Sequence, residues 1–542
     1  MRTAVTALSG AVALVLLISL ANAAGLFLIQ GSARTRELAV RAALGAERSR
    51  LVGQISIENA MLAVAAAVAG TLLAFAAVGM LVRGAPADLP RLSEVTVDRG
   101  ALAFALLAAV IATVGFGLIP TLWITRSTPF HSLRGSQRGA TGSSANRRLQ
   151  EALIVGQVAV AVVLFSGAGL LVRSLSNLRG VDLGVDQSGL ALVNVPRTTP
   201  TRADLPATIA FYGRLSERLA AAPGIRAVTA TTTLPFAGPN AYSTFYALPG
   251  QTAAQAGRNS SVDLEAAAPN FFATLAIPIV RGRPFSTSDR AGPPSVIVNA
   301  AFAREAWRGR NPIGERLKFG GAESPSMWYS VVGVAADSRY RNLTRDVPTV
   351  YLPLERLDSL MGLPPSVLAV RSTLAPGAVL GLVRSIAHQL DPSVETLGVE
   401  TIPDALAAPL ARPRFSTGLL TTFALIAILL TTIGLFGVMA SFVQERTREI
   451  GIRIAVGAQT AQIRRLVLGR GLRLTALGMG IGLAFALGIT RLLASLLYEL
   501  RPSDPLTYLT VAAGMMAVTA LACYWPVRRA ARIDPMTVLT SD

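Results

Sequence analysis

Residues 446–458 read RTREIGIRIAVGA, and residues 34–46 read RTRELAVRAALGA. Matching positions lie 412 residues apart without a gap, and each copy lies between two apolar runs. A basic stop signal beside a membrane span would need the positive charge, but not the same order of residues twice. The duplication therefore predicts that both segments have a specific role between equivalent membrane spans.

Each copy has the pattern of a short amphipathic helix. A glutamate stands four residues before an arginine, the orientation in which such a pair stabilises a helix. Apolar residues four apart form a narrow face beside the charges, and a glycine near the end of each copy can close the helix. The charged and glycine positions that the copies share are Arg34, Glu37, Arg41 and Gly45, and Arg446, Glu449, Arg453 and Gly457.

The composition is that of a membrane protein. The chain has 542 residues, of which 52% are hydrophobic, and its mean hydropathy is +0.51. A helix needs about 20 apolar residues to cross a bilayer. About seven spans are predicted, at 4–30, 54–82, 101–124, 152–172, 415–443, 474–490 and 505–527.

The net charge of +19 comes from arginines that alternate between the two sides of these spans. Arginines cluster at 31–54, 125–150, 444–473 and in the tail from Arg528, whereas 83–100 balances its arginines with acidic residues. The positive-inside rule places the arginine-rich segments in the cytoplasm. This pattern predicts a cytoplasmic C-terminus and an exterior N-terminus, and it explains the charge without nucleic acid.

The N-terminal span has an alternative interpretation. Ala21-Asn22-Ala23 follows an apolar stretch and has the small-residue form of a signal-peptide cleavage site. Residues 8–33 nevertheless align without gaps with 420–445, the span before the second arginine-rich copy. The alignment favours a retained membrane span.

A second repeat sets the domain boundaries. Residues 120–133 (PTLWITRSTPFHSL) match 526–539 (PVRRAARIDPMTVL) at an offset of 406, so three spans on each side are duplicates. We predict a partial unit of three spans at 1–133, a flexible cytoplasmic linker at 134–149, a leading transmembrane helix at 150–174, an extracytoplasmic domain at 175–414 and a second three-span unit at 415–542.

The segment 175–414 is more polar and alternates short β-rich runs with helical ones, which predicts an α+β domain with its own core. Helices are expected at 204–222, 269–275, 300–307 and 375–390, and strands at 227–233, 261–267, 295–299, 329–335 and 366–371. The last of these helices has one apolar face. His388 lies off that face and is expected on the surface.

The sequence lacks the residues that catalysis or internal energy coupling would need. Lys318 is the sole lysine and no glycine-rich loop precedes it, which excludes a P-loop. Cys523 is the only cysteine, and His131 and His388 are far apart, so no metal or cofactor site is predicted. The apolar runs carry no ionisable residue at mid-depth, which argues against an ion-coupled transporter. Any energy must therefore come from a partner.

Polar and small residues within the runs are expected to hold helices together. Asn22 and Gln157 are interpreted as hydrogen bonders between helices. Gly478, Gly480 and Gly482 are expected to allow a neighbouring helix to approach closely.

Several motifs carry a family resemblance. A resemblance to the extracytoplasmic core domain of MacB-type ABC permeases rests on 270–285 (NFFATLAIPIVRGRPF), 296–304 (VIVNAAFAR), 311–317 (NPIGERL), 331–337 (VVGVAAD) and 350–354 (VYLPL). A resemblance to FtsX-type permeases rests on 411–415 (ARPRF) and 444–453 (QERTREIGIR). The chain is most similar to duplicated permeases of the acidobacterial type.

The resemblance implies a polytopic α-helical protein of the inner cell membrane, with two FtsX-like units and an inserted extracytoplasmic α+β MacB-like core domain. In the family, the short cytoplasmic helix after the second span of each unit contacts a separate ATPase dimer. That contact would fall here on Arg34, Glu37, Arg41, Gly45, Arg446, Glu449, Arg453 and Gly457. The partner would bind the ATP, and the chain itself would need no cofactor and would not be an enzyme.

Other implied partners are a periplasmic adaptor or outer-membrane component and membrane lipid, and two matched helices suggest a pseudo-dimer within the chain. A whole family unit has four spans, whereas the first unit here begins at the second span, and no ATPase domain is fused. Two functions follow from the resemblance. One is the permease subunit of an ATP-driven exporter of amphiphilic substrates, and the alternative is an FtsX-like mechanical signalling protein that regulates an extracytoplasmic partner without transport.

Overall fold

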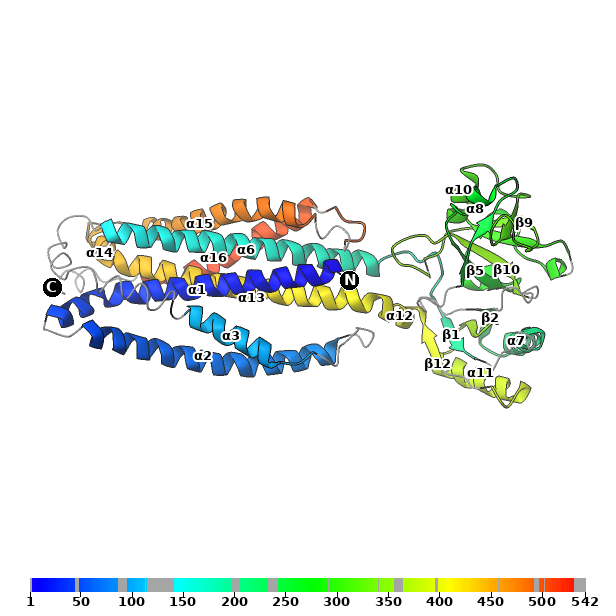
Figure 1. Cartoon of the computed structure of the whole chain (residues 1–542), viewed down its shortest axis with the longest axis horizontal. Coiled ribbons are helices and arrows are strands. Elements are labelled where there is room, and N and C mark those ends of the chain that lie inside the picture. Colours follow the sequence, from blue (N-terminus) through cyan, green and yellow to red (C-terminus); the bar gives the residue numbers. More distant parts are fainter. Residues whose placement is uncertain are drawn as a thin grey trace. The chain divides into compact units, whose positions relative to one another are not determined.

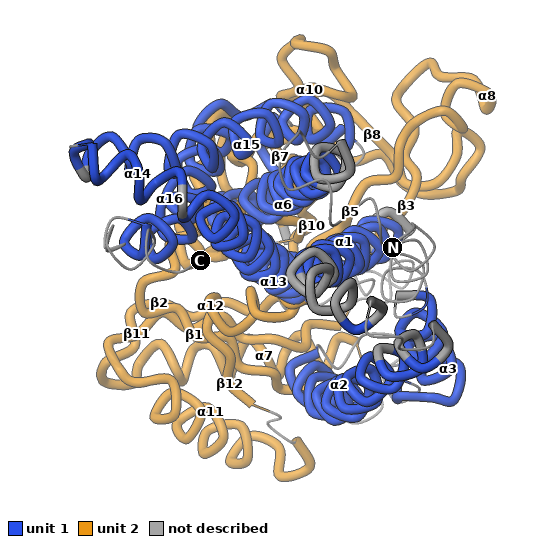
Figure 2. The backbone as a smooth tube through the Cα atoms, turned by 90° about the vertical axis from the view of Figure 1, so that its left-hand side faces the viewer, with its two compact units in different colours: residues 1–177, 412–542 blue, residues 178–411 orange. Residues whose placement is uncertain are grey.

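The structure is a computed structural model (Figure 1). It describes residues 2–43, 48–85, 95–112, 114, 141–196, 205–232, 242–290, 292–339, 341–354, 364–394, 398–456, 458–491, 497–501 and 503–530. The chain divides into two compact units, coloured separately in Figure 2. The first unit comprises 1–177 and 412–542, and the second comprises 178–411.

The first unit is a bundle of helices formed by the apolar runs. Its helices are α1 (Arg2–Ala43), α2 (Arg48–Gly84), α3 (Arg99–Ala112), α6 (Thr141–Arg179), α13 (Ala407–Glu445), α14 (Thr447–Ala455), α15 (Thr460–Ile489) and α16 (Pro505–Ala530). Within the described ranges, six helices are long and apolar enough to cross a membrane. Helix α3 is the shorter start of the expected span at 101–124, and most of the rest of that span lies outside the described residues.

Close packing against α6 depends on two glycines of α15. A Cβ at Gly478 would lie 2.7 Å from the carbonyl oxygen of Val155, and one at Gly482 would lie 2.6 Å from that of Ala159. Any larger residue would push the two helices apart, so these two positions act as predicted. Among the described residues, no atom lies within 4 Å of a Cβ placed at Gly480, so the packing role predicted for it is wrong.

The segment predicted as a flexible linker is partly helical. Helix α6 begins at Thr141, so residues 141–149 continue the membrane helix, while 134–140 lie outside the described residues. Arginine and leucine are good helix formers and fill the end of this segment. An ion pair between Arg147 and Glu445 of α13, with 3.3 Å between Nη2 and Oε2, also fastens it.

The second unit contains a four-stranded and an eight-stranded sheet, which confirms the α+β prediction. The smaller sheet is antiparallel, in the order β12 (Gly398–Thr401), β1 (Leu190–Asn194), β11 (Val367–Ser372) and β2 (Ile225–Thr231). Helices α7 (Leu205–Ala220) and α11 (Pro376–Leu390) contact this sheet and each other. They bury one face each, and His388 of α11 is exposed as predicted.

The larger sheet is mixed. Its order is β3 (Ser243–Thr244), β5 (Val262–Ala267), β10 (Thr349–Pro353), β7 (Ser295–Asn299), β9 (Tyr329–Ala335), β8 (Arg316–Phe319) and β4 (Tyr246–Ala247), with β6 (Ile279–Gly282) paired to β9. The pairs β5/β10 and β7/β9 are parallel. Short helices α8 (Ala253–Ala256), α9 (Phe271–Leu275), α10 (Ala300–Trp307) and α12 (Ile402–Ala405) and the 3₁₀ turn η5 (Thr287–Arg290) complete the unit.

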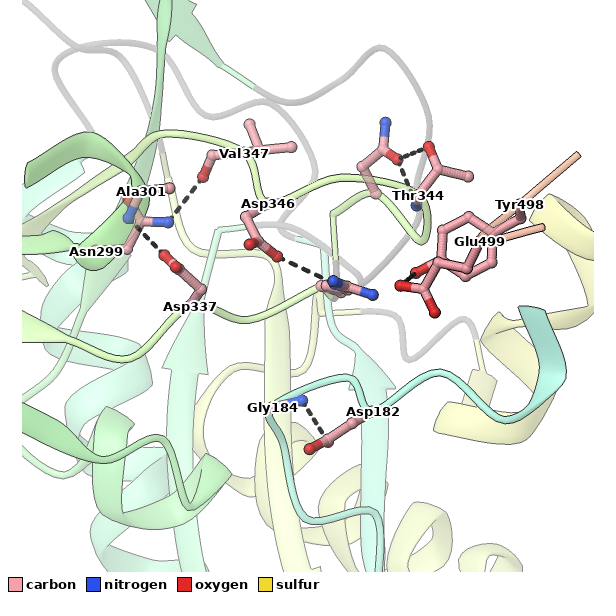
Figure 3. A network of polar contacts seen from close by, with 12 residues as sticks. Asp182, Gly184, Asn299, Ala301, Asp337, Thr344, Asp346, Val347, Tyr498 and Glu499 are labelled. Carbon is pink, nitrogen blue, oxygen red and sulfur yellow. Dashed lines mark hydrogen bonds and ion pairs between the residues drawn. The ribbon is translucent and has the colours of Figure 1, made fainter. Parts of the chain in front are cut away.

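The motif VIVNAAFAR turns from strand β7 into helix α10 at Asn299. The Asn299 Oδ1 accepts hydrogen bonds from the backbone nitrogens of Phe302, at 3.0 Å, and Thr349, at 2.9 Å. Its Nδ2 donates to the carbonyl oxygen of Val347 at 2.9 Å, and Asp337 accepts from the backbone nitrogen of Ala301 (Figure 3). One buried asparagine therefore caps the helix and fixes a neighbouring strand at the same time.

Candidate functional site

The second arginine-rich copy forms a separate short helix, α14, directly after α13. Glu449 lies in its first turn and Arg453 in its last, the arrangement that the helix dipole favours. The Arg453 Nη2 lies 2.6 Å from Glu449 Oε1, and the Arg446 Nε lies 3.6 Å from Glu449 Oε2. The predicted pairing of Glu449 with Arg453 is therefore confirmed. Gly457, the predicted end of the helix, lies outside the described residues.

Helix α14 has one anchored face and one exposed face. Ile450 is fully buried, and Ile454 packs against the same hydrophobic cluster of the bundle. On the other side, Val456 is 83% exposed and Ile452 is 46% exposed. The apolar anchor holds the helix on the bundle, while two apolar side chains and an ion pair remain available to a partner.

An open groove runs beside the exposed face of α14. Its volume is about 570 Å³. It is lined by Ile452, Arg453, Val456, Ala458, Gln462 and Ile463, and thus by α14 and the beginning of α15. An apolar floor with one cation at its edge suits a protein surface that carries an apolar side chain next to an acidic one.

The joint between α14 and the membrane helices is built around Phe442. The guanidinium carbon of Arg446 lies 4.9 Å from the centre of this ring, and that of Arg470 lies 4.3 Å from it. Arg470 also forms an ion pair with Glu151 of α6. Helices α6, α13, α14 and α15 therefore meet in one cluster of charged and aromatic side chains.

Sequence reasoning missed this joint. The Phe442–Arg446 contact spans four residues, from the last turn of α13 to the residue that precedes α14, and could have been found from spacing. The contacts of Arg470 with Phe442 and Glu151 join three different helices, so only the fold reveals them.

The first arginine-rich copy differs from the second. Its residues 34–43 continue helix α1, so the separate short helix predicted for this copy is not formed within the described residues. The Arg41 Nη1 donates to Oε1 of Gln54, a residue of α2, at 3.2 Å. The side chains of Arg34 and Glu37, and all of Gly45, lie outside the described residues.

Of the two polar residues predicted to form hydrogen bonds between helices, Asn22 does so, whereas no hydrogen bond of the Gln157 Oε1 is found among the described residues. Asn22 of α1 donates from Nδ2 to the carbonyl oxygen of Leu430 in α13 at 2.6 Å. Asn22 and Gln157 of α6 are both buried and line the same small hollow beside Gly434. In the described ranges, no group of three or more His, Cys, Asp or Glu residues could hold a metal ion.

Two protein-family models together match almost the whole chain. The model described as "FtsX-like permease C-terminal" matches residues 9–129 and again 421–535. The model described as "MacB-like periplasmic core domain" matches residues 152–390.

Curated relatives are named as exporters. A probable syringafactin export ATP-binding/permease protein of Pseudomonas syringae is 27% identical over 53% of this chain and 43% of its own length. A macrolide export ATP-binding/permease protein, MacB, of Agrobacterium fabrum is 27% identical over 50% of this chain and 42% of its own. The chain thus spans less than half the length of these relatives.

Among solved structures, the periplasmic region of MacB from Actinobacillus actinomycetemcomitans is similar over 43% of this chain and 94% of that one, with 13% identity and a TM-score of 0.29. The six apolar helices and the periplasmic-type domain make this a multi-pass membrane protein with an extracytoplasmic segment. With FtsX-like segments on both sides of a MacB-like periplasmic core domain, the chain belongs to the MacB/FtsX-type family of ABC transporter permeases.

Proposed function

We propose that this chain is the permease subunit of an ATP-driven exporter that takes its energy from a separate cytoplasmic ATPase dimer. It transmits the motion of the ATPase through the membrane helices to the extracytoplasmic domain, which moves amphiphilic substrates at the outer face. A periplasmic adaptor or an outer-membrane component would complete the path. Lipid surrounds the bundle in the inner membrane, and the arginine-rich ends face the cytoplasm.

One observation carries this proposal. Val456 and Ile452 are exposed on α14 beside the Glu449–Arg453 pair, although Ile450 fixes the same helix firmly to the bundle. Single exposed apolar residues are common on protein surfaces, but Ile452 and Val456 line one groove together, which suits contact with a partner. A helix that receives a partner needs both the anchor and the exposed contact.

The joint at Phe442 gives the motion a path. The cation–π contacts of Arg446 and Arg470 connect α14 to α13 and α15, and the Arg470–Glu151 pair connects them to α6. Helices α6 and α13 lead into and out of the extracytoplasmic domain along the chain. A displacement of α14 therefore bears directly on the two helices that are continuous with that domain.

The test is co-purification of the tagged chain with the ATPase encoded beside it. Val456→Asp places a charge on the exposed face of α14 and is expected to abolish co-purification. Val280→Asp is the matched control, because Val280 is 55% exposed on β6 of the other unit. Unchanged co-purification of the Val456→Asp protein would refute the proposed contact.

Charge reversal separates helix stability from docking. The double variant Glu449→Arg with Arg453→Glu keeps an ion pair within α14 but reverses the charges that a partner meets. We expect correct membrane insertion and loss of ATPase binding. Retained binding would show that only the helix matters, and the proposed charge matching would be wrong.

The orientation is tested by labelling cysteines in intact cells. The native Cys523 is buried, so it gives little background. A membrane-impermeant maleimide should label Glu217→Cys, on exposed α7, but should label Gln462→Cys, at the beginning of α15, only after the cells are opened. Labelling of Gln462→Cys in intact cells would place the arginine-rich helices outside and end the proposal.

A further inference from the structure

Helices α1 and α13 are equivalent elements of the internal repeat, and they also lie side by side. Residues 8–33 and 420–445 align without gaps at an offset of 412, so Asn22 corresponds to Gly434. Both helices run in the same direction along the bundle in Figure 1, and the end view in Figure 2 shows them next to each other. The two repeats therefore contact each other through matching helices.

The contacts fall at equivalent positions. A Cβ at Gly434 would collide with the Oδ1 of Asn22, its own counterpart in the repeat. Asn22 bonds to Leu430, which corresponds to Ile18, a residue 1% exposed. One turn further along, a Cβ at Gly437 would lie 3.7 Å from side-chain atoms of both Leu26 and Ile29. Gly437 corresponds to Gly25, which lines the same hollow as Leu26 and Ile29.

Such contacts identify a symmetry axis. When two copies of a helix pack in parallel about a two-fold axis that runs along them, equivalent residues meet at the crossing. Neighbouring contacts then join positions about three or four residues apart on each side, as in a parallel coiled coil. Asn22 and Gly434 meet at equivalent positions, as this arrangement requires, and the neighbouring contacts of Asn22 with Leu430 and of Ile29 with Gly437 are each offset by four positions.

The meeting residues are nevertheless different in size. Two asparagines at this crossing would compete for the same space, and two glycines would leave a void and no hydrogen bond. With asparagine on one repeat and glycine on the other, a single side chain occupies the space at the crossing. Specific pairing commonly combines such a good fit with penalties on the wrong partners.

A third helix reinforces this choice. The Oε1 of Gln157, from α6, lies 2.5 Å from the position of a Cβ on Gly434. Both amide groups thus occupy the space that the glycine leaves open. The Oδ1 of Asn22 and the Oε1 of Gln157 are buried without a hydrogen-bond partner among the described residues.

We propose that the crossing of α1 and α13 lies on a pseudo-two-fold axis between the repeats, and that Asn22 and Gly434 form an asymmetric knob-and-hole pair. This pair selects α13 of the same chain as the partner of α1, and it disfavours pairing of α1 or α13 with its copy in a second chain. The interface does not depend on the proposed transport function.

Cross-linking tests the axis without disturbing the pair. The double variant Leu26→Cys with Gly437→Cys is compared with two co-expressed single variants that carry one of these cysteines each, all in a Cys523→Ala background, and membranes are treated with a short bismaleimide. The double variant should give a cross-linked product of one-chain mass, and the co-expressed single variants should give no cross-linked product. A product of two-chain mass as the main product of the co-expressed single variants would mean that a second copy supplies the partner, and it would overturn the proposal.

A reciprocal exchange tests the pair itself. Gly434→Asn and Asn22→Gly should each lower the thermal unfolding midpoint of the purified protein and reduce its same-chain cross-link. The exchange variant Asn22→Gly with Gly434→Asn should recover most of the midpoint lost in Gly434→Asn alone. Gln157→Ala added to the exchange should raise the midpoint again, because it removes the remaining overlap at position 434. If the unfolding midpoint of the exchange variant fell by as much as the losses of the two single variants added together, the knob-and-hole pair would be contradicted.

Discussion

At the scale of single residues, Glu265 joins the two sheets of the extracytoplasmic domain. Its Oε1 accepts hydrogen bonds from the hydroxyls of Thr231 and Thr232, both at 2.6 Å, and its Oε2 lies 2.5 Å from Arg341 Nη2. Glu265 belongs to β5 of the larger sheet, whereas Thr231 ends β2 of the smaller one. A buried carboxylate thus holds the edge of one sheet against the other.

We predict that Glu265→Gln lowers the free energy of unfolding of this domain by about 1–3 kcal/mol, because Arg341 loses its shorter ion pair and keeps only the one with Asp263, at 3.7 Å. Urea unfolding of the detergent-solubilised chain, followed by tryptophan fluorescence, measures the loss. The double variant Glu265→Gln with Arg341→Met removes both charges and should recover part of it. Arg341→Met alone gives the reference. If the double variant lost as much unfolding free energy as the two single variants added together, the two residues would not act as a pair.

Asp289 makes the stability of the same domain depend on pH. Hydrogen bonds from Arg283, at 2.7 and 2.8 Å, hold the pKa of Asp289 well below its usual value, and the backbone and hydroxyl of Ser286 add to the effect. A lowered native pKa stabilises the fold above the unfolded value near 3.9, and this contribution falls as the pH drops through and below it. The domain should therefore lose stability below about pH 4. In Asp289→Asn this part of the pH dependence should vanish, with about 1–3 kcal/mol lost at neutral pH. An acid unfolding series measures both.

At the scale of elements, contact between α6 and α15 depends on glycine at two positions and not at the third. Gly478→Val should destabilise the bundle by about 1–3 kcal/mol, because the new side chain would overlap Val155 and Val158. Gly480→Ala is the control, since nothing lies within 4 Å of the new Cβ and alanine favours helix over glycine. Thermal unfolding in detergent should separate the two. Equal losses would mean that helix propensity, not contact, decides this site.

The joint at Phe442, between α14 and the membrane helices, is expected to transmit motion and not to bind the ATPase. Phe442→Leu keeps an apolar residue of similar size but removes two cation–π contacts, each worth about 0.5–2 kcal/mol. We predict that the ATPase still co-purifies, while stimulation of its ATP hydrolysis by amphiphiles falls severalfold. Phe436→Leu is the control, because Phe436 lies on the same helix but is 38% exposed. Loss of co-purification in Phe442→Leu would instead assign the residue to the docking surface.

At the scale of the whole molecule, the repeat predicts the stoichiometry of the assembly. If the α1–α13 crossing is the pseudo-two-fold axis, one chain presents both arginine-rich segments to one ATPase dimer. We expect a mass of one permease chain for two ATPase subunits, measured by light scattering in detergent or by native mass spectrometry. An assembly of two chains with two ATPases would show that symmetry comes from a second copy.

The sequence by itself determined the membrane class, the duplication, the α+β insertion and the polarity of α14. Apolar run length, repeat spacing and charge order are local properties, and they are visible without knowledge of what packs where. The same local rules misjudged Gly480 and the helical part of the linker, because neither apolar content nor glycine count says which face meets a neighbour. They also left out strands β1 and β10, in which nearly every residue is buried and no alternation of apolar and polar residues marks a strand.

Only the tertiary structure decided how the candidate site is fastened and how the repeats meet. The pairing of Glu449 with Arg453 could be predicted because four residues of helix separate them. The meeting of Phe442 with Arg470, and of Asn22 with Gly434, could not, because hundreds of residues separate Asn22 from Gly434 and a separate helix carries Arg470. Packing alone brings such residues together. Buried side chains must pack closely without overlap and must satisfy their hydrogen bonds. Both requirements act between neighbouring helices and not along the chain.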